Sequence, residues 1–202
     1  MIFLSLLQRL MEWDRDLLIW LNSIHADSLD PVMYNLTQTW FWIPLYVFLL
    51  WLIIKDFKKE WWIPMVGIGL TILLADQVTS SLMKPYFARL RPSQEPSLQG
   101  IIHLVMHHGQ IYTGGLYGFA SSHAANTFAT ATFFSLLFKP KHNWMLLLFP
   151  WAIIMTYTRI YLGVHYPGDI LFGATVGVLS ALVGYWAFKK LKAKVDESSR
   201  AA

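Results

Sequence analysis

Three short polar clusters hold the side chains of this 202-residue chain that could do chemistry. The first runs from Lys84 to Pro92 and offers two cations suited to an anion. Lys84 supplies a point charge, and Arg91 supplies a planar fork that can grip two oxygens. Basic residues that snorkel at a helix end would look the same, so this cluster alone leaves both interpretations open.

The second cluster runs from Tyr117 to Asn126 and contains Ser121, Ser122 and His123, at the start of an apolar stretch. Ser121 is suited to cap a helix, and the free N–H groups of a helix N-terminus favour an anion. Ser122 adds a donor, and His123 in the first turn could give or take a proton. Three glycines before Ser121 would let the incoming chain approach closely: Gly114, Gly115 and Gly118.

The third cluster runs from Thr158 to Asp169 and contains Arg159 and His165. His165 and Asp169 are four residues apart across a predicted helix start, so they could face one another. An aspartate there would hold one ring nitrogen, fix the tautomer and leave the other nitrogen as a nucleophile. The three clusters together are an inventory for phosphoryl transfer, in which positioning and charge neutralisation supply most of the catalysis.

The composition is that of a membrane protein. The chain is 55% hydrophobic and 14% charged, whereas a soluble domain is about 25% charged. Its 10 Trp, 9 Tyr and 13 Phe suit membrane interfaces. The absence of cysteine excludes disulfides, thiolate metal sites and a cysteine nucleophile. The net charge of +4 lies in short clusters without a long basic stripe, so no nucleic-acid partner is expected.

The elements that must position the clusters are predicted from apolar stretches. A membrane-spanning helix needs about 20 residues, and five stretches approach this length: 32–54, 61–83, 122–138, 144–161 and 170–188. The third and fourth are short alone but convincing within the series. Residues 1–30 resemble an interfacial helix rather than a signal peptide. We therefore expect an all-α, polytopic membrane helix bundle: one domain over 1–202, with about five transmembrane helices plus an N-terminal interfacial helix.

The basic residues predict the orientation of this bundle. Ten of the 16 fall on one side of the predicted spans: Lys55, Lys58, Lys59, Lys139, Lys141, Lys189, Lys190, Lys192, Lys194 and Arg200. The positive-inside rule makes that side cytoplasmic. We therefore expect a multi-pass protein of the plasma (inner) membrane whose polar clusters face the periplasm or exterior. The outer link over 84–121 is too long for a simple connection, which favours a functional role.

In this order, the clusters resemble the motifs of the phosphatidic acid phosphatase type 2 family. Its Lys-x6-Arg-Pro motif is matched in full from Lys84 to Pro92, and its Ser-Arg-x5-His-x3-Asp motif keeps both spacings, with Thr158 in place of Ser. The Pro-Ser-Gly-His motif departs more, with Ala120 for Pro and Ser122 for Gly. The family uses the backbone N–H of that Gly against phosphate, so we expect a slightly altered phosphate pocket.

The resemblance implies a role for each matched residue. Lys84, Arg91 and Arg159 would hold the phosphate oxygens, together with Ser121 and the N–H of Ser122.

The resemblance also implies the catalytic steps. His165 would attack phosphorus, with Asp169 orienting it. His123 would protonate the leaving oxygen and then help to activate the water that hydrolyses phosphohistidine. Members of this family need no metal, so no cofactor is expected.

The position of the clusters at the ends of spanning helices favours a lipid phosphate as the substrate. Within the family this fits undecaprenyl diphosphate, phosphatidylglycerol phosphate, phosphatidate or a lipid A phosphate, and the compact, bacterial-looking chain favours the first two. A lipid-to-lipid phosphotransferase and a non-catalytic lipid-phosphate binder are the alternatives. Vanadate-dependent peroxidation, known in soluble relatives, is disfavoured by the five predicted spans. Nothing in the sequence indicates an oligomeric state.

Four further polar residues have no assigned role. The spacing of His103, His107 and His108 resembles a metal site, but no carboxylate or thiolate is near them in the sequence. A surface or headgroup contact is therefore the favoured interpretation. Asp76 lies near the outer end of the second predicted span, where it could support a cation of the first cluster or make a polar helix contact.

Overall fold

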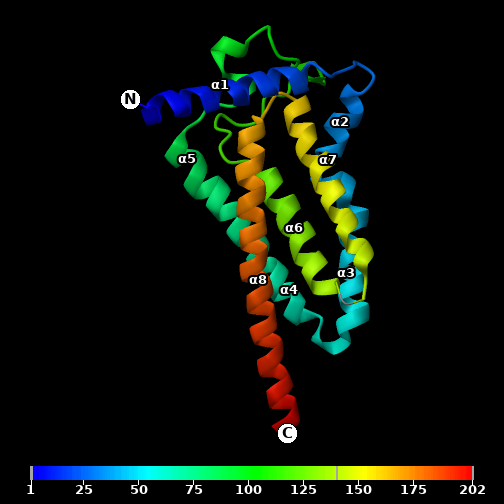
Figure 1. Cartoon of the computed structure of the whole chain (residues 1–202). Coiled ribbons are helices and arrows are strands. Elements are labelled where there is room, and N and C mark those ends of the chain that lie inside the picture. The colour runs from blue at the N-terminus through cyan, green and yellow to red at the C-terminus, as the bar shows by residue number, and fades with distance from the viewer. Residues whose placement is uncertain (1, 140, 202) are drawn as a thin grey trace.

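The computed structural model describes residues 2–139 and 141–201 as a helix bundle with one helix lying across its end. That helix is α1 (Ile2–Asn22), which crosses the bundle rather than joining it (Figure 1). Among its exposed side chains are many large apolar ones: Leu6, Leu7, Leu10, Met11, Trp13, Leu17 and Trp20. Both features agree with the predicted interfacial helix.

The first predicted span, over 32–54, is wrong in its start. The apolar span begins at Thr39 instead, because helix α2 (Asp30–Leu36) ends at Leu36 and Gln38 has extended backbone. The 3₁₀ turn η1 (Thr39–Trp42) then leads into α3 (Ile43–Phe57) and the turn η2 (Lys58–Glu60). The break is stable because the indole of Trp42 donates to the Leu36 carbonyl at 2.7 Å.

The second span is one continuous helix from Trp62 to Phe87. It consists of α4 (Trp62–Asp76), a π-helical segment η3 (Gln77–Met83) and α5 (Lys84–Phe87). π-helical turns occur often at functional sites because they change which residues face a neighbour. Here the segment lies directly before Lys84, the first residue of the first cluster.

The remaining bundle is built around α6 (Ser122–Phe138), which packs against α4, α7 and α8. The turn η6 (Asn143–Leu147) and α7 (Leu148–Tyr161) return the chain to the α1 end. Helix α8 (Pro167–Ala201) has 35 residues, so it continues well past the expected end at 188. At 1.5 Å per residue it is about 52 Å long, longer than the hydrocarbon core of about 30 Å.

Small residues bring α6 and α8 into close contact. Gly173 and Gly177 of α8 are spaced four apart, and a Cβ at either would overlap the α6 backbone at Ser121 O or Ala125 O. Small residues at this spacing are how membrane helices pack closely. The N-terminal ends of α6 and α8 are thereby held together at the α1 end of the bundle.

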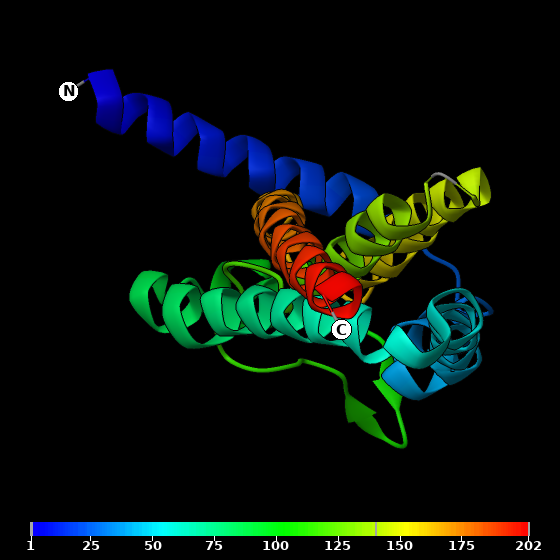
Figure 2. The same cartoon turned by 90° about the horizontal axis from the view of Figure 1, so that it is seen from below.

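The long link after α5 has little regular structure. It contains the 3₁₀ turns η4 (Pro92–Gln94) and η5 (Pro96–Leu98) and a small antiparallel hairpin of β1 (Met106–His107) and β2 (Gln110–Ile111). Seen from below, α8 lies between α1 and the α4–α5 helix (Figure 2).

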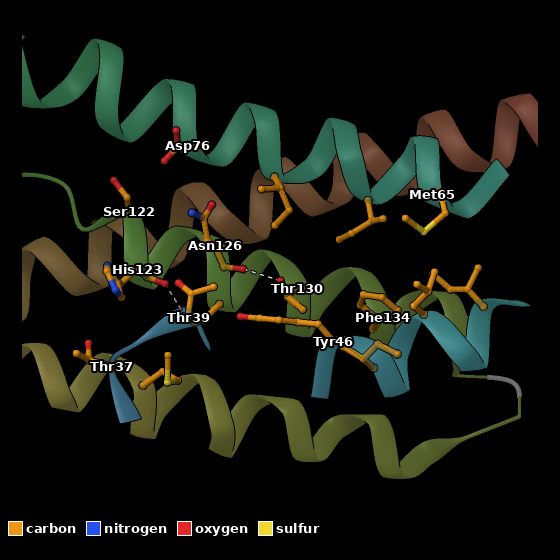
Figure 3. A pocket seen from close by; sticks show the side chains of 17 residues that line it. Thr37, Thr39, Tyr46, Met65, Asp76, Ser122, His123, Asn126, Thr130 and Phe134 are labelled. Carbon is orange, nitrogen blue, oxygen red and sulfur yellow. Dashed lines mark hydrogen bonds between the residues drawn. The ribbon is translucent and has the colours of Figure 1, made fainter. Parts of the chain in front are cut away.

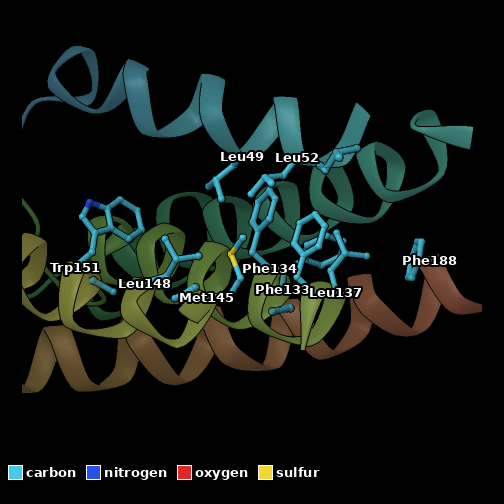
Figure 4. Close-up of a cluster of buried hydrophobic side chains, with 14 of the residues drawn as sticks. Leu49, Leu52, Phe133, Phe134, Leu137, Met145, Leu148, Trp151 and Phe188 are labelled. Atoms are coloured by element: carbon cyan, nitrogen blue, oxygen red, sulfur yellow. The ribbon is translucent and has the colours of Figure 1, made fainter. Parts of the chain in front are cut away.

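A cavity of about 490 Å³ lies between α3, α4 and α6 (Figure 3). The main hydrophobic core adjoins this cavity and joins α3, α6, α7 and α8 (Figure 4); its members include Leu49, Leu52, Phe133, Phe134, Trp151 and Phe188.

Ion pairs join the basic links at the end of the bundle opposite α1 (Figure 1), which we call the core end. Lys141 lies 3.3 Å from Asp56, and Lys192 lies 3.0 Å from Glu60. These pairs connect the α6–α7 link, the α3–α4 link and α8. The predicted grouping of these links is therefore confirmed, while the side of the membrane on which they lie stays a prediction.

Three helices in the described part of the chain are long and apolar enough to cross a membrane: Thr39–Glu60, Trp62–Phe87 and Pro167–Arg200. Helices α6 and α7 are shorter, with 17 and 14 residues. Because α6 is enclosed by other helices, most of its side chains meet protein. The all-α bundle is confirmed, and the number of five spans stays a prediction.

Candidate active site

Backbone hydrogen bonds bring the three polar clusters together. Arg91 N donates to Leu116 O at 3.0 Å, and Gly118 N donates to Arg89 O at 2.9 Å, which joins the first cluster to the second. Ser121 N donates to Asp169 O at 3.0 Å, which joins the second to the third. Residues 80 positions apart therefore share one site at the α1 end of the bundle.

Two cations of the site are fixed by neutral oxygens. Lys84 Nζ donates to Ser122 Oγ at 2.7 Å. Arg91 is 8% exposed, and its Nε and Nη1 donate to Tyr117 O and Val164 O at 3.1 and 3.5 Å. Arg91 therefore has its guanidinium held between the second and third clusters.

Arg159 is the most deeply buried cation, with 2% exposure. Its Nη1 donates to Thr37 Oγ1 at 2.7 Å and to Tyr112 OH at 3.1 Å. Its buried Nε has no hydrogen-bond partner among the described residues. Thr37 at the end of α2 and Tyr112 after the hairpin thus hold one side of the guanidinium and leave donors for a ligand.

None of these three cations has a carboxylate within ion-pair distance in the described ranges. An unpaired buried charge is costly, so such a set is stable only with a compensating anion or with water. Lys84, Arg91 and Arg159 together therefore form a candidate anion site.

His165 and Asp169 face one another as their spacing predicts. His165 Nδ1 lies 3.3 Å from Asp169 Oδ2, and the two side chains are 1% and 0% exposed. Because a carboxylate accepts, Nδ1 carries the hydrogen and Nε2 keeps its lone pair. Burial lowers the pKa of His165 well below its ordinary value, and the cations of Arg91 and Arg159 lower this pKa further. His165 is therefore neutral near pH 7, as a nucleophile must be.

Gly118 gives the chain room beside this pair. A Cβ at position 118 would lie 2.9 Å from Asp169 Oδ2 and 3.6 Å from His165 Nδ1. A side chain there would therefore push on the carboxylate, which agrees with the close approach predicted for the glycines before α6.

Ser121 caps α6 as predicted, because its Oγ accepts from Ala124 N at 3.4 Å. The departure at position 122 has a visible consequence. Ser122 Oγ lies 2.7 Å from Lys84 Nζ, 2.8 Å from Ser80 Oγ and 3.1 Å from Thr79 Oγ1. The family has Gly at this position and therefore lacks this hydroxyl. In this chain the hydroxyl joins the π-helical segment to α6.

Asp76 belongs to the same network. Ser80 donates to Asp76 Oδ1 at 3.1 Å, and Ser80 in turn meets Ser122, the partner of Lys84. Of the two cations that Asp76 could support, the contacts therefore connect it to Lys84.

His123 lines the polar end of the 490 Å³ cavity, beside Ser122 and Thr37 (Figure 3). Farther along, the cavity is apolar, with Phe134 and Met65 in its walls (Figure 3). His165 is not among the residues that line it. The cavity thus leads from an apolar region between three helices to one side of the predicted site.

The histidines of the long link lie away from this site. His103 is half-buried, with Nε2 2.9 Å from Asp30 Oδ1 and its ring stacked on His25 at 3.9 Å. The surface contact predicted for His103 is therefore wrong, because α2 brings a carboxylate that is distant in sequence. His107 stacks on Tyr34 at 3.8 Å. No group of three or more potential ligands in the described chain could hold a metal ion.

Two contributors to the site were missed from the sequence. Arg89 Nη1 donates to Asp169 Oδ1 at 2.9 Å, and Arg89 Nη2 donates to Asp14 Oδ2 at 2.7 Å. Arg89 lies within the first motif at a variable position, so an extra cation there was the available signal. Asp14 had no such signal, because it lies 75 residues before Arg89, in the interfacial segment.

Comparison with known proteins gives whole-chain relatives. The chain is 35% identical over 199 residues to the lipid A 4'-phosphatase of Bacteroides thetaiotaomicron, covering 96% of this chain and 85% of that protein. It is 34% identical over 187 residues to the lipid A 4'-phosphatase of Porphyromonas gingivalis, covering 91% and 75%.

Solved structures agree in fold. Aquifex aeolicus LpxE superposes with a TM-score of 0.63 at 25% identity, covering 84% of this chain and 92% of that one. The PAP2 type phosphatidylglycerolphosphate phosphatase of Bacillus subtilis superposes with a TM-score of 0.62 at 20% identity, covering 93% and 88%.

The family model for the PAP2 superfamily matches residues 64–193, a range that contains all three polar clusters. The resemblance carried by the motifs is therefore confirmed. This chain belongs to the PAP2 superfamily and is a lipid phosphatase of that family.

Proposed function

We propose that this enzyme removes a phosphate from lipid A or a closely similar phosphorylated glycolipid, through a phosphohistidine intermediate on His165. The two whole-chain relatives are named for the 4'-phosphate of lipid A, which favours this substrate over the undecaprenyl diphosphate and phosphatidylglycerol phosphate that the sequence alone suggested. The clustering of basic residues on one side of the predicted spans supports a location in the inner membrane, with the site facing the periplasm.

The observation that carries the proposal is a set of three cations, two of them buried, without carboxylate partners among the described residues. Lys84, Arg91 and Arg159 come from three separate elements, and Arg159 keeps a buried donor free among the described residues. A phosphate dianion would supply the missing negative charge and accept from both guanidinium groups. The N-terminus of α6 at Ser121 and Ser122 adds backbone donors.

The chemistry then follows from the orientation of His165. Its Nε2 lone pair attacks phosphorus, an N–P bond forms, and the P–O bond to the lipid breaks. Asp169 stabilises the positive charge that develops on the imidazole ring. His123 gives its proton to the leaving oxygen, so the glycolipid departs as an alcohol.

The second half of the reaction restores the enzyme. His123, now neutral, takes a proton from a water that attacks the phosphorus of phosphohistidine. The N–P bond breaks, and inorganic phosphate leaves with His165 neutral again. No step requires a metal, because the three cations neutralise the phosphate oxygens.

The cavity supports a lipid substrate. Its volume of about 490 Å³ lies within the usual range for ligand pockets. It is polar at His123 and apolar toward Phe134. A fatty acyl chain could occupy the apolar part while the phosphate lies beyond the polar end, among Lys84, Arg91 and Arg159.

The test is phosphate release by detergent-purified protein in EDTA. The panel contains lipid A, undecaprenyl diphosphate, phosphatidylglycerol phosphate and phosphatidate. His165→Ala is the inactive variant, and His142→Ala is its control, because His142 pairs with Asp56 at the core end. We expect metal-independent release from lipid A by the wild type and by His142→Ala only.

Three results would change the proposal. Faster release from another lipid would move the substrate assignment to that lipid. Release by His165→Ala at the wild-type rate would remove the phosphohistidine mechanism. Release that appears only when a second lipid accepts the phosphate would identify a phosphotransferase.

A further inference from the structure

The interfacial helix α1 reaches the catalytic pair through one side chain. Asp14 lies in the middle of α1, and its carboxylate is 15% exposed. Its Oδ1 accepts from Gly168 N at 2.7 Å, in the first turn of α8. A Cβ at position 168 would lie 2.8 Å from Asp14 Oδ2, so the approach requires glycine there. Asp14 is therefore docked on the residue that immediately precedes Asp169.

Arg89 joins Asp14 to the catalytic carboxylate with separate nitrogens. Nη2 donates to Asp14 Oδ2 at 2.7 Å, and Nη1 donates to Asp169 Oδ1 at 2.9 Å. The guanidinium also lies 3.8 Å over the ring of Tyr166. These contacts hold the guanidinium on three sides, so its position is fixed before substrate binds.

The other oxygen of Asp169 serves His165. Oδ2 accepts from Tyr166 N at 3.1 Å and lies 3.3 Å from His165 Nδ1. Since Arg89 holds Oδ1, the plane of the carboxylate is fixed and Oδ2 is directed at the imidazole. Asp14, Arg89, Asp169 and His165 therefore form one continuous chain of contacts from α1 to the proposed nucleophile.

We infer that Asp14 and Arg89 are positioning residues for the Asp169–His165 pair, which makes α1 a working part of the active site. The inference rests on the proposed phosphohistidine mechanism. Asp169 is fully buried and needs a cation. Lys84, Arg91 and Arg159 make no ion pair with it among the described residues, and Arg89 does.

The two sides of α1 support this role. Asp14, Leu18 and Asn22 follow one another at intervals of four and form its inner stripe. Leu18 packs with Leu98, Ile160 and Tyr166, and Asn22 Nδ2 donates to the Ile160 and Tyr161 carbonyls at 3.1 and 2.9 Å.

The outer stripe of α1 consists of exposed apolar residues that suit the membrane interface: Leu10, Trp13, Leu17 and Trp20. Seating of this stripe in the interface would hold α1, and with it Asp14, in place over the site.

The test compares Asp14→Asn and Arg89→Gln with Asp16→Asn and Arg9→Gln, which change exposed charges on α1. Steady-state rates on lipid A are measured together with the Tm of each variant in detergent. A misplaced catalytic group can cost about 10²-fold in rate. We expect about a 100-fold loss of kcat in Arg89→Gln, about a tenfold loss in Asp14→Asn, and KM within about twofold of wild type.

Two further variants separate positioning from structure. Arg89→Lys keeps a cation and should recover part of the lost kcat. The double variant Asp14→Asn/Arg89→Gln should be no slower than Arg89→Gln alone, because both act through one contact chain. Asp14→Asn keeps the shape of the side chain and an oxygen for Gly168 N, so it provides the test should Arg89→Gln fail to fold.

Three results would overturn the inference. Wild-type kcat in both single variants, with His165→Ala inactive, would leave the proposed function standing and remove the role of α1. A loss confined to KM, or one that tracks Tm alone, would show a structural role only. Activity in His165→Ala would remove the proposed mechanism and this inference with it.

Discussion

The two ends of the bundle are held together by different physics. At the core end, rings and aliphatic side chains interlock, as in Phe133, Phe134 and Trp151 (Figure 4). At the α1 end, hydrogen bonds join loops and helix ends, and buried cations have no carboxylate partner within the described part of the chain. The core end is complete by itself, whereas the proposed site at the α1 end would be completed by a bound anion. The difference shows where stability was given up for function.

The largest effect on the rate of phosphate release is expected from His165→Ala, at the α1 end. The variant removes the proposed nucleophile, so phosphate release should fall by at least about 10⁴-fold. His142→Ala, at the core end, should keep the wild-type rate. Phosphate release in EDTA measures the rates of both variants. An equal loss of rate in the two would contradict a catalytic site confined to the α1 end.

Arg159→Met should separate activity from stability. Loss of one charge-stabilising group costs about 10²–10³ in kcat. The same change removes an unpaired buried cation, so Tm in phosphate-free detergent should stay unchanged or rise. Phe133→Ala is the matched variant at the core end, where Tm should fall while the folded fraction keeps its kcat. A large drop in Tm for Arg159→Met would mean that its bonds to Thr37 and Tyr112 dominate.

Gly177→Ala tests how the close packing of α6 and α8 positions the site at the α1 end. The new Cβ would overlap Ala125 O, so α8 must shift from α6. Overpacking of this kind costs about 1–3 kcal/mol, and kcat should fall because the shift moves Asp169 relative to Ser121. Gly69→Ala is the control, because nothing lies within 4 Å of a Cβ there. A neutral Gly177→Ala would contradict the close packing of the two helices.

The sequence predicted the local contacts of the site but missed the contacts between residues far apart in the chain. Local spacing fixed the His165–Asp169 pair and the Ser121 cap, because both depend on neighbours within four residues. The motifs also identified Lys84, Arg91 and Arg159. Contacts across long separations were not predictable, such as Thr37 with Arg159 or Asp30 with His103, because no local pattern encodes them.

The span boundaries show the same limit. The break at Gln38 depends on Trp42 reaching back to Leu36. A hydropathy pattern averages over such a break, and so it gave one span where the chain has two helices.

A smaller effect is expected in the pH dependence of stability, to which the buried His165 contributes at the α1 end. Burial and nearby cations lower the pKa of His165. As pH falls through about 6.5, the unfolded chain binds a proton that the folded chain does not, so stability falls with pH. The limit is about 1.4 kcal/mol per pH unit. Tm measured from pH 8 to pH 5 should show a shallower slope in His165→Asn, and identical slopes would contradict a neutral His165.

Ser122→Gly should have the smallest effect and be the most informative about the departure from the family motif. The substitution restores the family's residue and removes the hydroxyl that accepts from Lys84 at 2.7 Å. One hydrogen bond to a charged group is worth about 1.5–3 kcal/mol at most. If phosphate itself takes over Lys84 when it binds, kcat/KM should change by less than about tenfold, because the lost partner matters only in the empty site. A loss well beyond that would mean that the Ser122 hydroxyl holds Lys84 in place during the reaction, with Ser80 and Asp76 behind it. Rates of Ser80→Ala decide between these explanations, since only the second predicts that it, too, is slow.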